Sequence, residues 1–301
     1  MAKVFPITKT RYLNYIKLRA RQVAPRLIDW PEQFTPFSLE RTDMDSCVLS
    51  NGPTRCGTNL VNSLIVGLDH WQHIGVRIDR EHYEIRAPDG KTSFYYCSWD
   101  SAAKKLRNGQ KVHGHLPWSR ALEKSLNQVM PNRRFKHLFI YRDPRDAMVS
   151  GWRQDFYPEM IPGQSETTEE RNRWRKSFAN DDERLTYTLK HPQYYTFPQY
   201  EPWLHSPNCF PVKFEDLYPE IVALQHNGLG PVLRRILDYL ELDASDVRPE
   251  DLYHKVYGKS LNFSTEKDKV GQYKRVFKDQ HYALIDTPEF RNILNVFGYE
   301  W

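Results

Sequence analysis

The sequence predicts an α/β protein, a single domain with a central parallel β-sheet that is flanked by helices. Short apolar runs are followed by turn signals and by helical stretches, and this order repeats along the chain. Parallel strands need crossover connections, whose helices cover both faces of a sheet. The 301 residues, 40% of them hydrophobic and 14% aromatic, provide enough apolar surface for a core and exclude wholesale disorder.

A basic arm precedes this domain. Residues 1–26 contain seven basic residues and no acidic one, whereas the other 275 residues contain 36 basic and 38 acidic residues. We therefore predict a basic N-terminal arm and helix over residues 1–40, packed on a body formed by residues 41–301. The amphipathic pattern at residues 10–28 also fits an arm that binds a membrane or a partner. The body is not basic overall, so no nucleic-acid partner is expected.

Four apolar runs are predicted to be strands. Residues 47–50 end in the turn sequence Asn51-Gly52-Pro53, and residues 137–141 (His-Leu-Phe-Ile-Tyr) are strongly β-forming. Residues 111–115 and 211–214 are two further short strands. The helical patterns lie at residues 58–68, 119–129, 144–150 and 232–240.

Two segments interrupt this order. Residues 158–184 are polar and charged, which is typical of an exposed helix or of a mobile excursion. Residues 191–211 contain five prolines and six aromatic residues and cannot form a regular helix. They are either an irregular wall of an aromatic pocket or a proline-rich connection on the surface.

Composition also bears on location and on metal sites. Cys47, Cys56, Cys97 and Cys209 form no C-x-x-C pair, so neither a zinc site nor a disulfide framework is expected, and a reducing compartment fits. No apolar run reaches the roughly 20 residues of a membrane span. The basic N-terminus lacks the apolar core of a secretory signal. We therefore expect a cytoplasmic protein without a metal site.

The most informative motif joins the first strand to the first helix. Gly52 and Gly57 have the G-x-x-x-x-G spacing of a loop that binds phosphate through backbone N–H groups and the positive end of a helix. A Walker loop continues with Lys and Ser or Thr, but this chain has Thr58 and Asn59. The cation in this loop is Arg55. The motif predicts an anion site without the Walker residues for Mg²⁺; a purely structural turn is the alternative.

A second anion site is predicted after residues 137–141. Arg142 stands at the carboxyl end of that strand, the edge at which open α/β sheets bind ligands. Ser150 follows within the next helix and can share one anion with Arg142. The alternative is a surface arginine that pairs with Asp143 or Asp146.

Two histidines share one face of the strand at residues 111–115. His113 and His115 occupy alternate positions. A histidine at a strand end beside a phosphate loop suits a general base, because its unperturbed pKa is about 6.5. A structural histidine is the alternative, and no neighbouring Asp, Glu or Cys completes a metal-binding set in the sequence.

Together, these segments resemble the PAPS-dependent sulfotransferase family of the cytosolic type. Residues 53–60 (Pro-Thr-Arg-Cys-Gly-Thr-Asn-Leu) are similar to its 5′-phosphosulfate loop, P-[KR]-S-G-T-T-W. Residues 140–150 resemble its 3′-phosphate segment, and residues 113–117 (His-Gly-His-Leu-Pro) resemble K-T-H-L-P. Residues 213–217 are similar to Y-E-D-L, and residues 267–274 to the C-terminal R-K-G loop. The matches follow the family order.

The resemblance implies a P-loop NTPase-like sulfotransferase fold that uses PAPS (3′-phosphoadenosine 5′-phosphosulfate) as co-substrate and requires no metal. It implies that His115 is the catalytic base and that Arg55 takes the place of the family's catalytic lysine or arginine. The residues that it implies for binding PAPS are Arg55, Cys56, Gly57, Thr58, Asn59, Arg142, Ser150 and Lys267.

The chain also departs from the family pattern. Thr54 is an additional residue in the loop, and Leu60 stands where the family has a tryptophan that stacks on adenine. Residues 266–268 read Glu-Lys-Asp, so Lys267 is the clearest match in the C-terminal loop. His113 replaces the lysine two positions before the base. A dimerisation segment is not recognisable, although a homodimer is compatible with the sequence.

The expected reaction is in-line transfer of a sulfuryl group from PAPS to a hydroxyl or an amine of a small-molecule acceptor, which yields PAP and a sulfated product. His115 would remove the acceptor proton, and Arg55 would stabilise charge on the leaving phosphate oxygen. Two alternatives stay open. One is a P-loop kinase that acts on a small molecule or a nucleotide. The other is a non-catalytic nucleotide-binding module whose basic arm docks on a membrane or an acidic partner.

Overall fold

The computed structural model describes residues 44–79, 82–86, 92–96, 108–120, 122–124, 134–154, 168–190, 197–259 and 269–301. The N-terminal arm predicted at residues 1–40, most of the helix predicted at residues 119–129, and Lys267 lie outside these ranges. Of the strands between residues 72 and 96, only the backbone is described.

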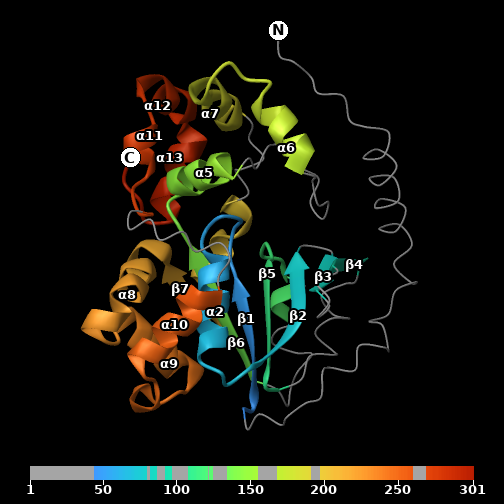
Figure 1. Ribbon diagram of the computed structural model, residues 1–301, viewed down its shortest axis with the longest axis vertical. Helices are drawn as coiled ribbons and strands as arrows, with labels where there is room; N and C mark the ends of the chain where they lie inside the picture. The colour runs from blue at the N-terminus through green and yellow to red at the C-terminus, as the bar shows by residue number, and fades with distance from the viewer. Residues whose placement is uncertain are drawn as a thin grey trace.

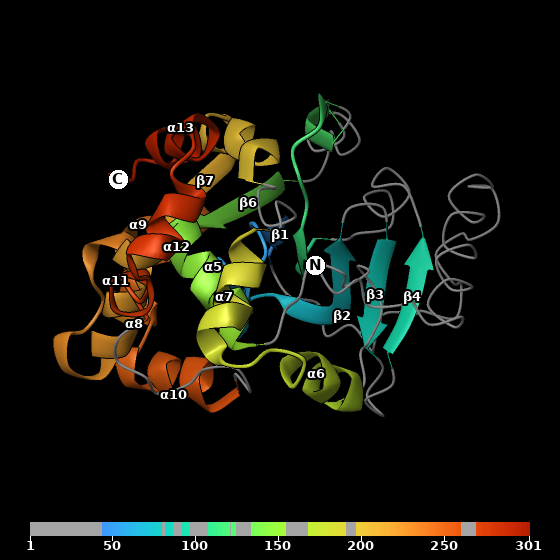
Figure 2. The ribbon, with the colours of Figure 1, turned by 90° about the horizontal axis from the view of Figure 1, so that it is seen from above.

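The described residues form a seven-stranded sheet in the order β4-β3-β2-β5-β1-β6-β7. From β2 to β7 the neighbouring strands are parallel, as predicted, whereas β3 and β4 extend the sheet in antiparallel fashion and were not predicted. Figure 2 shows β2, β3 and β4 side by side at one end of the sheet. The strands are β1 (Ser46–Asn51), β2 (Gln72–Asp79), β3 (His82–Arg86), β4 (Thr92–Tyr96), β5 (Gln110–His115), β6 (Arg134–Tyr141) and β7 (Cys209–Lys213).

The described helices confirm the helices predicted at residues 58–68, 144–150 and 232–240. The α-helices are α2 (Thr58–Gly67), α5 (Pro144–Arg153), α6 (Thr168–Arg175), α7 (Asp181–Leu189), α8 (Phe214–Asn227), α9 (Pro231–Leu240), α10 (Pro249–Lys259), α11 (Tyr273–Val276), α12 (Asp279–Ile285) and α13 (Pro288–Val296). The short 3₁₀-helices are η2 (Phe197–Gln199), η3 (Glu201–Leu204) and η4 (Ala244–Asp246).

At Phe214 the prediction assigns the wrong element. The strand predicted at residues 211–214 begins at Cys209 and ends at Lys213, and Phe214 is the first residue of α8. Glu215 and Asp216 stand in the first turn of that helix, where carboxylates interact favourably with the positive end of the helix dipole. The local charge pattern therefore ends the strand earlier than the apolar run suggested.

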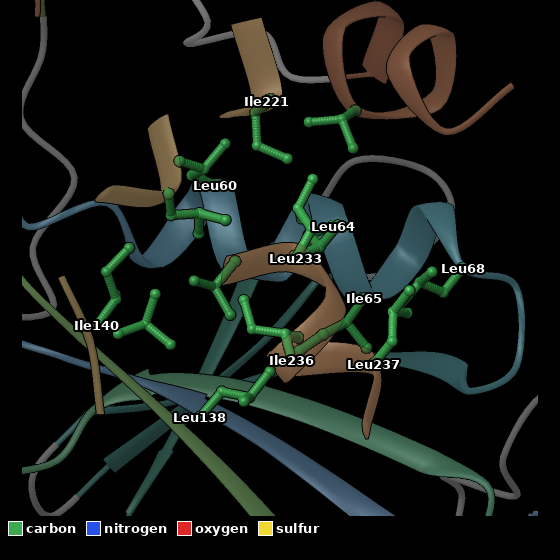
Figure 3. Close-up of a cluster of buried hydrophobic side chains, with 14 of the residues drawn as sticks. Leu60, Leu64, Ile65, Leu68, Leu138, Ile140, Ile221, Leu233, Ile236 and Leu237 are labelled. Carbon is green, nitrogen blue, oxygen red and sulfur yellow. The ribbon is translucent and has the colours of Figure 1, made fainter. Parts of the chain in front are cut away.

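Helices cover both faces of the sheet. Val48 of β1 belongs to a buried cluster with α2, α8, α9 and α10, and its neighbour Leu49 belongs to a second cluster with η2, η3 and α13. Figure 3 shows the first cluster, in which Leu64 of α2 and Ile236 of α9 lie above Leu138 of β6. Successive residues of a strand point to opposite faces, so each strand contributes to both clusters.

A third group of helices lies beyond the carboxyl ends of β1 and β6. It comprises α5, α7, α11, α12 and α13 (Figure 1). Met148 and Val149 of α5 pack there with Leu185 of α7 and Phe290 of α13. These helices form one side of the edge at which the two predicted anion sites are expected.

The two irregular segments are now defined in part. The described part of residues 158–184 contains α6 and the start of α7, so the helical interpretation is confirmed there. Phe197, Tyr200 and Trp203 are buried against the sheet. The described part of residues 191–211 is thus irregular, with two short 3₁₀-helices whose aromatic side chains are anchored in the core. Among the described residues, no helix is long and apolar enough to cross a membrane.

Candidate functional site

The loop at residues 52–57, which we call the phosphate loop, has the backbone shape that its glycines predict. Arg55 and Gly57 have φ angles of 69° and 99°, in the left-handed region. A Cβ atom on Gly57 would lie 2.6 Å from the ring of Phe214, and one on Gly52 would lie 2.1 Å from the carbonyl oxygen of Ile140. Both positions therefore require glycine.

Helix α2 begins directly after this loop. The Gly57 carbonyl accepts the N–H group of Leu60 at 2.8 Å, and Gly57 has no side chain with which to cap the helix. The first-turn N–H groups thus remain directed at the loop, where they favour an anion. Thr58 is buried and Asn59 is exposed.

Cys56 lies inside the loop with its thiol turned into the core. Its N–H group donates to the Pro53 carbonyl at 3.2 Å, and its side chain is fully buried. Burial raises the pKa of the Cys56 thiol, so a reactive thiolate is not favoured. Cys56 thus supports the phosphate loop through its buried side chain and its N–H bond to Pro53. Its predicted contact with the co-substrate stays a prediction.

The structure brings Arg55 and Ser150 together. Nε and one terminal nitrogen of Arg55 donate to Oγ of Ser150 at 3.3 Å and 3.1 Å. Ser150 belongs to α5, which follows β6, so this contact joins the phosphate loop to the second predicted anion site. Both residues are half-buried, and the two predicted anion sites are therefore adjacent.

Arg142 is buried, with 4% of its surface exposed. Its guanidinium lies 4.4 Å from the centre of the Phe214 ring, contacts Asp146 at 3.4 Å and donates to the carbonyl of Lys269. The predicted alternative of a surface arginine is therefore wrong, although the ion pair with Asp146 is present. Nε of Arg142 is buried and has no hydrogen-bond partner among the described residues.

The turn that carries Arg142 is held by residues far along the chain. Glu215 accepts the N–H group of Asp143 at 3.0 Å and the hydroxyl of Tyr299 at 2.8 Å. Asp143 in turn binds Arg145 at 2.7 Å, and Arg145 also donates to the carbonyl of Glu300. Burial raises the pKa of Glu215, and the two hydrogen bonds oppose that change by favouring its carboxylate.

Asp146 fixes the segment that follows the C-terminal loop. Its carboxylate accepts the N–H groups of Gly271 at 2.7 Å and Tyr273 at 3.0 Å. Arg153 donates to the side chain of Gln272 at 3.1 Å and adds a second link between this segment and α5. Burial raises the pKa of Asp146, while Arg142 and the two N–H groups lower it. Residues 269–273 are thus bound to the helix that carries Ser150.

His115, the last residue of β5, lies beside the first residue of the phosphate loop, Gly52. It is 7% exposed, and its Nδ1 lies 2.8 Å from the carbonyl oxygen of Gly52. A carbonyl oxygen can only accept, so in this contact Nδ1 carries the proton and the neutral ring keeps its lone pair on Nε2. The predicted base and the predicted anion loop therefore meet at Gly52.

Asn51 and Trp203 are further parts of the site that the sequence did not single out. Asn51 accepts the N–H group of Leu116 at 2.7 Å and donates to its carbonyl at 3.0 Å. Nε1 of Trp203 donates to the same carbonyl at 3.0 Å. These bonds fix the backbone directly after His115. The sequence signal for Asn51 is its position at the end of the first strand, where it also fits a turn.

The fold and these contacts define an α/β protein with an anion-binding loop after its first strand and a histidine beside that loop. Residues 45–275 match the family described as "Sulfotransferase domain". The match covers more than half of the chain, so the chain belongs to the sulfotransferase family. It is therefore an enzyme of the sulfuryl-transfer class.

Solved structures show weaker likeness. Mouse sulfotransferase SULT7A1 complexed with PAP is 13% identical, with a TM-score of 0.46, and the match covers 85% of this chain and 89% of that one. Retinol dehydratase in complex with androsterone and PAP is 13% identical, with a TM-score of 0.44 and coverages of 83% and 81%. No curated protein matches the chain.

Proposed function

We propose that this sulfotransferase moves a sulfuryl group from PAPS to a hydroxyl or an amine of a small-molecule acceptor. The observation that carries the proposal is the contact of His115 with Gly52, because it puts a base with its lone pair on Nε2 beside a loop built for an anion. Arg55, on the same loop, supplies the positive charge.

The site offers groups suited to a nucleotide with two phosphate ends. Gly52 and Gly57 leave room where any side chain would clash, so a phosphate can approach the loop backbone. The buried Nε of Arg142 has no partner among the described residues, which favours a ligand that accepts from it. The contact of Arg55 with Ser150 joins the phosphate loop to the helix that follows Arg142.

The residues divide the work of the reaction. PAPS supplies the sulfuryl group when it is bound. His115 takes the acceptor proton on Nε2 while its Nδ1–H bond to Gly52 holds the ring. Arg55 neutralises charge on the leaving phosphate oxygen, and Arg142 binds the distant phosphate. Catalysis then rests on positioning and on charge neutralisation, as in phosphoryl transfer.

The first experiment is a mass-spectrometric screen of hydroxyl and amine acceptors with PAPS. A gain of about 80 Da on an acceptor identifies sulfuryl transfer as the reaction class. ATP–Mg²⁺ turnover without PAPS turnover would favour the kinase instead. PAP binding without transfer to any acceptor in a broad panel would favour the non-catalytic module.

The second experiment tests the base. His115→Ala should lower kcat by about 10²–10⁴-fold while PAP still binds. His226→Ala is the matched control, because His226 is exposed on α8 and distant in sequence from the site. Unchanged turnover in His115→Ala would remove His115 from the proposed mechanism.

Three sequence predictions remain proposals about the whole chain. We propose that residues 1–40 form a basic arm, that the enzyme is cytoplasmic and that it can form a homodimer. Acceptor assays after deletion of the arm test the first proposal. Cell fractionation tests the location, and light scattering tests the oligomeric state. Lys267, Cys56 and Asn59 likewise stay proposed contacts of the co-substrate, to be tested by PAP affinity of their alanine variants.

A further inference from the structure

A row of titratable residues crosses the sheet at His115. The register pairs Asp79, the last residue of β2, with His115, the last residue of β5. The same Asp79 is paired with His82 of β3 on its other side. Figure 2 shows β2 and β3 as neighbouring strands at this end of the sheet. Three strands thus place His82, Asp79 and His115 in one line.

Register partners in neighbouring strands lie on the same face and have Cα atoms about 5 Å apart. His115 shares its face with Lys111, whose side chain binds Asn62 of α2, so the row belongs to the face that α2 covers. β2 and β5 are parallel, and their carboxyl ends meet at the ligand-binding edge of the sheet. Asp79 is therefore placed at the same edge as the proposed base.

The sheet register and the phosphate loop identify the charged groups placed around this row in the described part of the chain. In the adjacent row the register pairs Arg77 with His113 and with Glu84, so that row carries both signs of charge. On the β1 side the neighbours are Ser50, which is paired with His113, and the Gly52 carbonyl. Helix α2 contains no titratable residue, and the phosphate loop contributes Arg55. Asp79 is thus the acidic residue in register with His115.

We propose that Asp79 is a positioning residue that stabilises the imidazolium form of His115 during catalysis. The inference rests on the proposed function, in which the acceptor proton moves to Nε2 of His115 as the new S–O or S–N bond forms, the bond between sulfur and the phosphate oxygen of PAPS breaks and PAP leaves. The ring then carries a full positive charge while its Nδ1–H donates to the carbonyl of Gly52. An acidic residue at the register position next to His115 would supply the opposite charge, as an aspartate does beside a catalytic histidine in hydrolases.

The decisive test is histidine-selective NMR titration of the full chain, with the His115 signal assigned from its loss in His115→Ala. In Asp79→Asn the titration midpoint of His115 should fall by about one pH unit, because the charged ring loses its counter-charge. This measurement needs neither donor nor acceptor, so it holds whatever the reaction proves to be. An unmoved midpoint in folded Asp79→Asn would overturn the inference.

Kinetics provides a second readout. In Asp79→Asn the acid limb of the profile of kcat/KM against pH should move to lower pH. The value of kcat at neutral pH should fall by up to about tenfold for every pH unit by which that limb moves, because a weaker base accepts the acceptor proton less readily. PAP affinity should stay unchanged. Asp69→Asn is the control, because Asp69 is an exposed acid at the end of α2 and should move neither limb nor rate.

The outcomes separate this inference from the proposed function. If wild type transfers a sulfuryl group and His115→Ala does not, but the profile of Asp79→Asn stays in place, then Asp79 has no such role and the function stands. If activity is lost together with thermal stability while the pH profile stays in place, Asp79 is structural only. Loss of wild-type activity in a chelator, with the same loss in His82→Gln, would point to a metal held by the row and would overturn the inference.

Discussion

The phosphate loop and the turn at residues 142–146 are adjacent, yet they hold their shapes in opposite ways. The loop depends on local backbone conformation, with left-handed residues at Arg55 and Gly57. The turn has ordinary backbone but depends on side chains and carbonyls more than 70 residues away, including Glu215, Tyr299 and Lys269. An added atom should therefore damage the first site, whereas a missing partner should damage the second.

The largest effect should come from the turn. Asp146→Ala leaves the N–H groups of Gly271 and Tyr273 and the buried Arg142 guanidinium without their carboxylate. Loss of one partner of a buried ion pair costs about 3–5 kcal/mol, so we expect that loss in the free energy of unfolding, together with weaker PAP binding. Denaturant melts and calorimetric titration with PAP measure the two effects.

Asp251→Ala is the control for this prediction, because Asp251 forms an exposed ion pair with Arg248. Exposed pairs contribute about 0–1 kcal/mol. If Asp146→Ala destabilised the protein no more than Asp251→Ala, the turn would not depend on its distant partners, and the contrast with the loop would disappear.

The next effect should come from the loop. Gly57→Ala must adopt a left-handed backbone, which costs about 1–2 kcal/mol, and must also displace the Phe214 ring, and overpacking of this kind costs about 1–3 kcal/mol. PAP affinity should fall as well, because the loop backbone moves. The matched control is Gly298→Ala, because Gly298 follows α13 with φ of 72°, in the left-handed turn that ends the helix, and has nothing within 4 Å of the new atom. Equal losses in both variants would show that the close approach to Phe214 is unimportant.

The free energy of unfolding should depend on pH through a buried residue that is packed against α2, the helix that follows the loop. Lys111 is fully buried on β5, where it binds Asn62, and burial lowers its pKa to about 7. Above pH 10.5 Lys111 is neutral in both the folded and the unfolded protein, so it does not lower the free energy of unfolding. As the pH falls from 10.5 toward 7, the unfolded chain binds a proton at Lys111 that the folded protein does not, and stability is lost.

Lys111→Met removes this dependence. The variant should gain about 1–3 kcal/mol over wild type near pH 7, after its lost hydrogen bonds are allowed for, and little above about pH 10.5. Chemical denaturation at several pH values measures the difference. Lys255→Met, at an exposed ion pair, should show no such trend. A gain that did not vary with pH would mean that Lys111 has the same pKa in the folded and the unfolded protein, and would contradict this prediction.

The smallest effect should come from the edge of the turn network. Tyr299→Phe removes one hydrogen bond to Glu215 and leaves the bond from Asp143 in place, so the loss should be about 0.5–1.5 kcal/mol with a small decrease in PAP affinity. Tyr239→Phe loses a comparable bond, which the tyrosine hydroxyl accepts from the His137 N–H group in the middle of β6. It should cost similar stability and leave PAP affinity unchanged; a decrease in PAP affinity in both variants would mean that the effect is not specific to the turn.

The same contrast explains what the sequence could predict. The loop is local, so its glycine spacing, the strand before it and the helix after it were all visible in residues 46–67. Arg142 was placed correctly at the end of its strand and Asp146 was named as a possible ion-pair partner, but Glu215 and Tyr299 were not recognised as support for this turn. Those contacts join segments that only the folded chain brings together, and no spacing rule relates them.

The strands β2, β3 and β4 were missed for a different reason. Residues 72–79 alternate apolar Ile74, Val76 and Ile78 with mostly polar positions, a pattern that predicts a strand with one polar face. The continuous apolar runs elsewhere gave a stronger signal. Without β2, nothing in the sequence relates Asp79 to His115, and the sequence alone showed no carboxylate near the proposed base.

The φ angle of 69° at Arg55 has a consequence for engineering. Glycine or asparagine would accept this backbone conformation at lower cost than arginine. A library of variants selected for thermal tolerance alone should therefore accumulate these two residues at position 55. Each selected variant would lack the guanidinium next to Ser150. The variants with the highest thermal stability would therefore have the lowest sulfotransferase activity.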